Sequence, residues 1–268
     1  MATFLLASMS LSGCFGTSVS QEADVRLATT TSMRDSGLLD VLIEEFTSLH
    51  DHTVEYVAVG TGAALRLGEQ GDVDALIVHA PDREQEFLDE GYGLNRTSFA
   101  WNSFVFLAPS TETTSIAEAF LEVVNRSSCF VSRGDFSGTH EKEQAIWRAL
   151  NETHAIEVVE DQNGLHPIGE WYHSIGQGMG ATINMADEKR CSTLSDRGTA
   201  LKFQSQIDLQ RYEYNDSVLF NPYSFIPVTG MANEGTQLFL HYLQNEGQIT
   251  TEAFSIDGER PFFVYDQP

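Results

Sequence analysis

The chain has 268 residues and carries 39 Asp and Glu side chains against 15 Lys and Arg, a formal net charge of −24. This balance argues against nucleic-acid binding, because proteins bind duplex backbones through clustered Lys and Arg. Hydrophobic residues make up 41% of the chain and aromatic residues 10%, which excludes a disordered acidic tail and predicts a folded protein of one large or two modest domains.

The basic residues are mostly arginines, and the only lysines are Lys142, Lys189 and Lys202. A surface rich in carboxylates and poor in lysine suits very concentrated salt, where screening removes most of the repulsion between carboxylates. We therefore expect a halophilic acidic surface. The plainer interpretation is an acidic, soluble protein with no such adaptation.

The first residues predict an export signal. Residues 1–13 are uncharged and mostly apolar, and this run is too short to span a bilayer as a helix, which takes about 20 residues. It is typical of the apolar part of a secretory signal peptide. The sequence Leu11-Ser12-Gly13-Cys14 resembles a lipoprotein cleavage box. We therefore expect lipid on Cys14 to anchor the protein at the outer face of the membrane, with residues 14–24 as a tether.

Strands and helices alternate in the next part of the chain. The strand-like run Val25–Thr30 is followed by a polar Ser/Thr loop and then by apolar residues that repeat at helical spacing from Leu38 to Phe46. Similar patterns predict strands at Val54–Val59, Asp74–His79 and Trp101–Leu107, and helices at Ala63–Gln70 and Glu84–Glu90. This alternation predicts a mostly parallel α/β sheet.

A second unit of the same kind begins after Pro109. Its expected elements are helices at Ile116–Val124, His140–Leu150 and Ala181–Lys189, and a strand at Cys129–Ser132. The tail returns to a strand at Tyr223–Val228 and two helices at 236–244 and 249–254. We therefore expect one lobe from residues 25–108 and 222–268, a second lobe from residues 109–221, and a ligand cleft between them.

Two cysteines remain once Cys14 is assigned to lipid. Outside the cell Cys129 and Cys191 could pair, but two cysteines do not make a zinc site, and the sequence leaves the bridge open.

Three polar loops each follow a predicted strand and open a predicted helix. They span residues 29–37, 60–62 and 132–139, and they are rich in Gly, Ser and Thr. The first turn of a helix has N–H groups without an intrahelical acceptor and carries roughly half a positive charge. Hydroxyl groups add donors, and glycines let the backbone approach closely. Such loops suit a tetrahedral oxyanion, although helix capping alone also explains each loop taken singly.

The third loop adds a cation to this pattern. Arg133 is followed by Asp135, a carboxylate able to hold its guanidinium, and then by the helix start Ser137-Gly138-Thr139. Arg133 alone could form only a surface ion pair of little value. The conjunction of cation, carboxylate and hydroxyl groups favours a ligand site.

Taken in order, these motifs resemble the tungstate-binding proteins of ABC importers. The resemblance covers nearly all of residues 25–254 and rests on residues 29–39, 57–65, 72–81, 132–140, 171–172, 176–180 and 196–199. It implies an α/β, two-lobed periplasmic-binding-protein fold of type II-like form. It also implies a protein that captures tungstate outside the membrane and delivers it to an ABC permease with a cytoplasmic ATPase.

The resemblance also implies roles for individual residues. The third loop resembles that of phosphate-binding proteins, in which the Arg and the Ser-Gly-Thr donate to the anion and the Asp orients the Arg. Carried over, Arg133, Ser137, Gly138 and Thr139 donate to the anion and Asp135 orients Arg133. From the first lobe we expect hydroxyl or amide donors at Thr31, Ser32 and Thr61, with Thr30 and Ser36 as outlying candidates.

Parts of this sequence are also compatible with other functions. The same fold could serve a molybdate-, sulfate- or phosphate-binding protein, or an oxyanion sensor domain. Gly176-x-Gly178-x-x-Ala181 imitates a dinucleotide fingerprint but lies far from the first strand–helix–strand unit. No Gly-x-Ser-x-Gly hydrolase motif occurs, and we expect His79 and His140 to be packing residues. We therefore expect binding without catalysis or cofactor, of tungstate or molybdate. With Asp135 taken up by Arg133, the loops offer no acceptor for a protonated anion.

Overall fold

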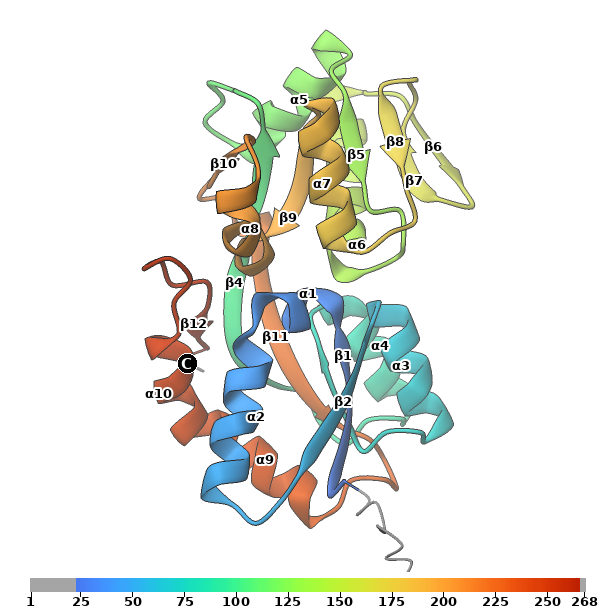
Figure 1. The fold of residues 1–268 in the computed structure, drawn as a ribbon. Helices are drawn as coiled ribbons and strands as arrows, with labels where there is room; N and C mark the ends of the chain where they lie inside the picture. The colour runs from blue at the N-terminus through green and yellow to red at the C-terminus, as the bar shows by residue number, and fades with distance from the viewer. Residues whose placement is uncertain (1–22, 266–268) are drawn as a thin grey trace, which may run out of the picture.

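The computed structural model describes residues 23–265 and shows two lobes connected by long strands (Figure 1). In the first lobe, three parallel strands alternate with helices, as their sequence patterns predict. These elements are β1 (Val25–Thr30), α1 (Thr31–Ser36), α2 (Leu38–Leu49), β2 (Val54–Val59), α3 (Thr61–Gln70), β3 (Ala75–Val78) and α4 (Pro81–Asp89). The C-terminal elements α9 (Glu234–Gln244), α10 (Glu246–Ala253) and β12 (Phe263–Val264) pack beside them.

The second lobe is built from the middle of the chain. Its helices are α5 (Ile116–Arg126), α6 (Gly138–His154), α7 (Met179–Lys189) and α8 (Arg197–Phe203), with short 3₁₀ helices η1 (Gln204–Gln206) and η2 (Ser217–Leu219). Its strands are β5 (Phe130–Ser132), β6 (Val158–Asp161), β7 (Gly164–Pro167), β8 (Tyr172–Ser174), β9 (Thr193–Asp196) and β10 (Gln210–Tyr212).

Strands β4 (Thr97–Ala108) and β11 (Phe220–Pro227) run between the lobes as an antiparallel pair. The first part of β4 places Phe99 in the core of the first lobe, and its second part places Phe104 in the core of the second. Asn102 and Asn221 lie opposite each other where the strands cross from one lobe to the other. The exact division of the chain at residues 108 and 222 stays a prediction.

The prediction of a mostly parallel sheet is wrong. The eight-stranded sheet has the order β10-β4-β11-β3-β1-β2, with β9 and β12 also paired to β4. Within it only β1–β2 and β1–β3 are parallel, and every pair that includes β4 or β11 is antiparallel. Strand β11 comes from the far end of the chain and inserts between β3 and β4, a pairing that local alternation of strands and helices does not encode.

The cores explain why the predicted helices form. In α2, Leu38, Leu39, Leu42 and Phe46 are all fully buried, which confirms the apolar helical face seen in the sequence. The second lobe has its own cluster around Trp147, which packs with Phe and Leu side chains from α5, β4 and β5. Each lobe therefore has its own apolar core, and polar side chains gather between the two.

Several features differ from the sequence-based expectation or lay beyond it. The polar loop expected after Val25–Thr30 contains the short helix α1, which Thr30 caps by accepting from the Met33 N–H. Cys129 and Cys191, whose pairing the sequence left open, form a disulfide with Cα atoms 4.6 Å apart. No helix within residues 23–265 is long and apolar enough to cross a membrane. The predicted signal peptide (1–13), Cys14 and most of the predicted tether lie outside the described residues.

Candidate functional site

The three predicted loops meet where the lobes face each other. Arg133, at the end of β5, reaches across to the first lobe, where its Nη2 lies 3.4 Å from Thr31 Oγ1. A Cβ built on Gly60 would lie 3.8 Å from the backbone oxygen of Asp135, and one on Gly178 would lie 4.0 Å from Thr31 Oγ1. Loops far apart in the sequence therefore line one interlobe region.

Arg133 is held as the sequence implies. The residue is only 2% exposed, and its Nε and Nη2 donate to Asp135 Oδ2 at 3.2 and 2.5 Å. The other carboxylate oxygen, Oδ1, accepts from the Ser137 N–H at 3.2 Å. Because the guanidinium is planar, these contacts direct its Nη1 edge away from Asp135. Asp135 thus orients the cation, and both of its oxygens are engaged.

The start of α6 supplies the hydroxyl groups expected there. Ser137 caps the helix, since its Oγ accepts from the His140 N–H at 3.4 Å. Thr139 Oγ1 is buried and has no hydrogen-bond partner among the described residues, and the same holds for Thr61 Oγ1 in the first turn of α3. Buried hydroxyls are normally hydrogen-bonded. Two unpartnered ones at helix starts in opposite lobes indicate a place for a ligand that accepts hydrogen bonds.

His79 orients Ser32. Its Nδ1 lies 2.9 Å from Asn221 Oδ1, which can only accept, so Nδ1 carries the proton. Burial lowers the pKa of His79 to about 4 and keeps the ring neutral. The unprotonated Nε2 therefore accepts from the Ser32 hydroxyl at 3.0 Å. The hydroxyl of Ser32 therefore points toward His79. The backbone N–H of Ser32 is the donor that this residue can offer a ligand.

His79 also belongs to a longer buried network. Its ring stacks on Tyr223, with centroids 4.7 Å apart, and Asn221 Nδ2 donates to Asn102 Oδ1 at 2.7 Å. The network connects the first-lobe loop to the two crossing strands. His79 is buried and packed as expected, and its role in orienting Ser32 had no signal in the sequence.

The two outlying candidates are engaged within the first lobe. Thr30 Oγ1 accepts from the Met33 N–H at 3.3 Å as the cap of α1 and lies 3.2 Å from Ser32 Oγ. Ser36 Oγ donates to the Met33 carbonyl at 2.7 Å and accepts from the Leu38 N–H at 3.4 Å. The Thr30 hydroxyl therefore stabilises the start of α1 and the Ser36 hydroxyl the α1–α2 junction, and Thr31 is the α1 residue whose hydroxyl meets Arg133.

The start of α8 is a further polar element near α1 that was not selected from the sequence. Asp196 is fully buried and caps α8 by accepting from the Thr199 N–H at 3.0 Å. Burial raises the pKa of the Asp196 carboxyl. Thr199 Oγ1 is buried without a hydrogen-bond partner in the described part of the chain. In the sequence, these residues belong to the segment 196–199, one of the segments that carry the resemblance to tungstate-binding proteins, and this resemblance could have identified them.

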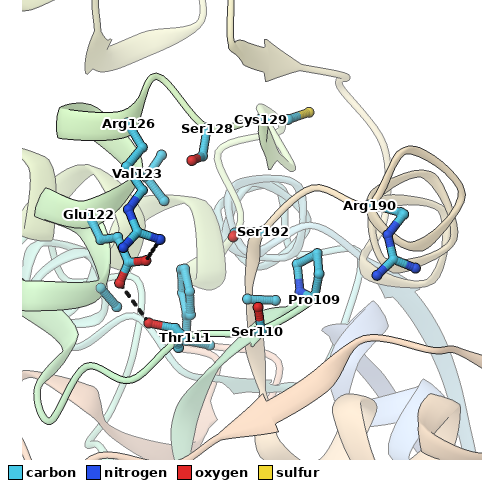
Figure 2. Close-up of a pocket in the computed structure, with 13 residues that line it drawn as sticks. Pro109, Ser110, Thr111, Glu122, Val123, Arg126, Ser128, Cys129, Arg190 and Ser192 are labelled. Atoms are coloured by element: carbon cyan, nitrogen blue, oxygen red, sulfur yellow. Dashed lines mark hydrogen bonds and ion pairs between the residues drawn. The ribbon is translucent and has the colours of Figure 1, made fainter.

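A separate cavity of about 210 Å³ lies in the second lobe beside α5 and the disulfide (Figure 2). It contains none of the predicted site residues. Arg126 on its wall pairs with Glu122, which also accepts from Thr111 Oγ1 at 2.9 Å. In Figure 2 Arg190 points away from this pair. Arg126 is thus a largely exposed cation that is already paired with Glu122, and the interlobe region, where Arg133 is buried, is the better candidate for an anion.

Comparison with known proteins identifies the fold. Residues 17–246 match the model of the PBP superfamily domain. The chain belongs to the PBP superfamily. A tungstate-binding protein TupA from Peptoclostridium acidaminophilum is 35% identical over 281 residues, a match that covers 98% of this chain and 93% of the relative.

Solved structures agree with this PBP assignment. The tungstate ABC transporter structure from Geobacter sulfurreducens has 37% identity and a TM-score of 0.72, and the match covers 86% of this chain and 98% of that chain. The tungstate-binding protein TupA from Desulfovibrio alaskensis G20 has 34% identity and a TM-score of 0.73, and the match covers 91% and 99%. The two-lobed periplasmic-binding-protein fold predicted from the sequence is confirmed.

Proposed function

We propose that this protein binds tungstate between its lobes, outside the cytoplasm, and delivers it to an ABC permease that works with a cytoplasmic ATPase. One observation carries the proposal. The buried guanidinium of Arg133 lies where helix starts from both lobes present unpartnered hydroxyls, those of Thr61 and Thr139. The tungstate-binding relatives, which match nearly the whole chain, support the choice of anion. They are binding proteins, in line with binding without catalysis.

The donors favour a fully deprotonated tetrahedral oxyanion. Neutral N–H and O–H donors together with one Arg stabilise such an anion, because each charge-assisted hydrogen bond is roughly twice as strong as a neutral one. A protonated anion would need an acceptor, yet both oxygens of Asp135 are engaged by Arg133 and Ser137. Leaving the O–H of hydrogen phosphate unpaired would cost about 1–3 kcal/mol. The third loop therefore disfavours phosphate. Asp196 Oδ2, at the start of α8, is a buried carboxylate oxygen without a hydrogen-bond partner in the described part of the chain, and burial favours the protonated form of this carboxyl by raising its pKa.

The anion would also hold the lobes together. Arg133, Ser137, Gly138 and Thr139 belong to the second lobe, and Thr31, Ser32 and Thr61 to the first. We assign residues 25–108 and 222–268 to the first lobe and 109–221 to the second. An anion that contacts both sets binds the closed arrangement better than an open one and so shifts the population toward closure.

The family and the N-terminal sequence support the proposed location. Binding proteins of ABC importers act outside the cytoplasmic membrane, and we propose that lipid on Cys14 anchors this one there, with residues 14–24 as the tether. The charge of −24 suits concentrated salt outside the cell. Cys14→Ser should move the protein from the membrane fraction to the supernatant of lysed cells. A variant that stays in the membrane fraction would contradict the anchor.

Calorimetry tests the proposed ligand. The protein should bind tungstate tightly, and the same titrations with molybdate, sulfate and phosphate rank the alternatives. Tungstate should also raise Tm in proportion to the logarithm of its concentration over Kd. Tight binding of phosphate with no heat from tungstate would overturn the proposal.

A further inference from the structure

An ion pair crosses between the lobes beside the candidate site. Arg83 belongs to α4 in the first lobe, and Glu141 lies in the first turn of α6 in the second. Their Nη1 and Oε1 atoms are 2.8 Å apart. The same Nη1 lies 3.4 Å from the backbone oxygen of Phe136. One side chain of the first lobe thus contacts both the loop that carries Asp135 and the helix that follows it.

Gly62 makes room for this guanidinium. A Cβ on Gly62 would lie 2.9 Å from both Nη1 and Nη2 of Arg83, closer than a side chain tolerates. Arg83 therefore packs against the first turn of α3, next to Thr61. Together with Arg66, these segments line an interlobe cavity of about 530 Å³.

The position of Arg83 has an electrostatic consequence. The start of α3 carries partial positive charge, so a cation beside it is unfavourable unless negative charge is near. Asp82 and Glu86 of α4 itself lie near this ion pair, and Glu141 adds its negative charge when α6 of the second lobe lies against α4. An anion at the start of α3 would add to it. Arg83 is therefore best stabilised when the lobes are together and the anion is bound.

We propose that Arg83 is a positioning residue that holds the two lobes together over the bound anion, through Glu141 and the Phe136 carbonyl, and so slows release of the anion. This inference rests on the proposed function. Arg83 and Glu141 are about one-third and one-quarter exposed. For a partly exposed pair of this kind we expect an effect of about two- to five-fold on the release rate.

The test measures tungstate release from the full chain by stopped-flow displacement. Arg83→Gln and Glu141→Gln should each speed release about two- to five-fold. The double variant should release no faster than Arg83→Gln, because both changes break the same contact. Arg66→Gln is the matched control. It removes the same charge from the same cavity, but among residues 23–265 Arg66 forms no ion pair, so its release rate should stay near that of the wild type.

Each outcome separates the inference from the proposed function. Equal release rates for the Arg83 and Arg66 variants, or additive effects in the double variant, would overturn the role of Arg83. A fall in Tm of the anion-free Arg83→Gln protein with no change in release would show a purely structural contact and also overturn it. Absence of tungstate binding by the wild type would instead overturn the proposed function.

Discussion

Gly138 begins α6 at a point where the second lobe touches the first. A Cβ there would lie 2.8 Å from His79 Cε1, 2.9 Å from Nδ1 and 3.0 Å from the His79 backbone oxygen. His79 has little room to move, because it is buried and hydrogen-bonded to Ser32 and Asn221 and it stacks on Tyr223. Gly138→Ala should therefore push α6 away from His79 and prevent the closed arrangement.

The affinity loss follows from the overpacking. Forcing an extra methyl into a tightly packed contact costs about 1–3 kcal/mol, which corresponds to an affinity about 5- to 150-fold weaker. Because an open form relieves the contact, the Tm of the anion-free protein should stay near that of the wild type. Calorimetry with tungstate measures the affinity, and thermal unfolding without tungstate measures the Tm of the anion-free protein.

A second glycine provides the control. Gly178, at the start of α7, also faces the first lobe, but a Cβ there would meet only Thr31 Oγ1, at 4.0 Å. Gly178→Ala should keep an affinity near that of the wild type. Unchanged affinity in Gly138→Ala would refute the reasoning, as would a drop in Tm of its anion-free form, since the contact would then be present without the ligand.

Three further predictions concern other parts of the molecule. Arg133→Ala should weaken tungstate affinity in calorimetry by about 2–5 kcal/mol, because it removes the buried cation and leaves Asp135 without its partner; unchanged affinity would place the anion elsewhere. Burial raises the pKa of Glu143 to about 7, above its unfolded value of 4.5. The contribution of Glu143 to the free energy of unfolding is therefore full below pH 4.5 and falls as pH rises through 7, by up to about 3 kcal/mol. Glu143→Gln should lack this fall in urea unfolding at pH 5 and 8, and pH profiles parallel to those of the wild type would contradict it. Replacing Cys129 and Cys191 by Ser removes a bridge with a sequence separation of 62 residues. This should cost about 4 kcal/mol and lower Tm on the order of 10 °C in calorimetry, and an unchanged Tm would show that the bridge does not constrain the unfolded chain.

Much of the fold was readable from local patterns. Amphipathic repeats located α2 and α6, and short apolar runs bounded by turns located β1 and β3. Helix α1 was missed because its six residues, Thr31–Ser36, have no apolar repeat. Strand β9 was missed because its burial comes from pairing with β4, about 90 residues earlier in the chain, rather than from its own composition.

The candidate site divides in the same way. Arg133 and Asp135 pair inside a single loop, so residue types and spacing predicted this contact. The hydrogen bond from the Ser137 N–H to Asp135 was not predicted. The link between His79 and Asn221 spans 142 residues, and the contact of Arg83 with Glu141 spans 58. Neither left a pattern that sequence reasoning could use.

The sequence by itself determined the positions of the main helices and strands, the pairing of Arg133 with Asp135 and the resemblance to a family. Capping, helix dipoles and apolar periodicity all act between residues a few positions apart, and they can therefore be read along the chain. Only the tertiary structure decided the antiparallel crossing strands, the disulfide, the orientation of the Ser32 hydroxyl and the ion pair between the lobes. Each of these depends on atoms brought together by packing of distant segments, and that packing is decided by the apolar cores as a whole.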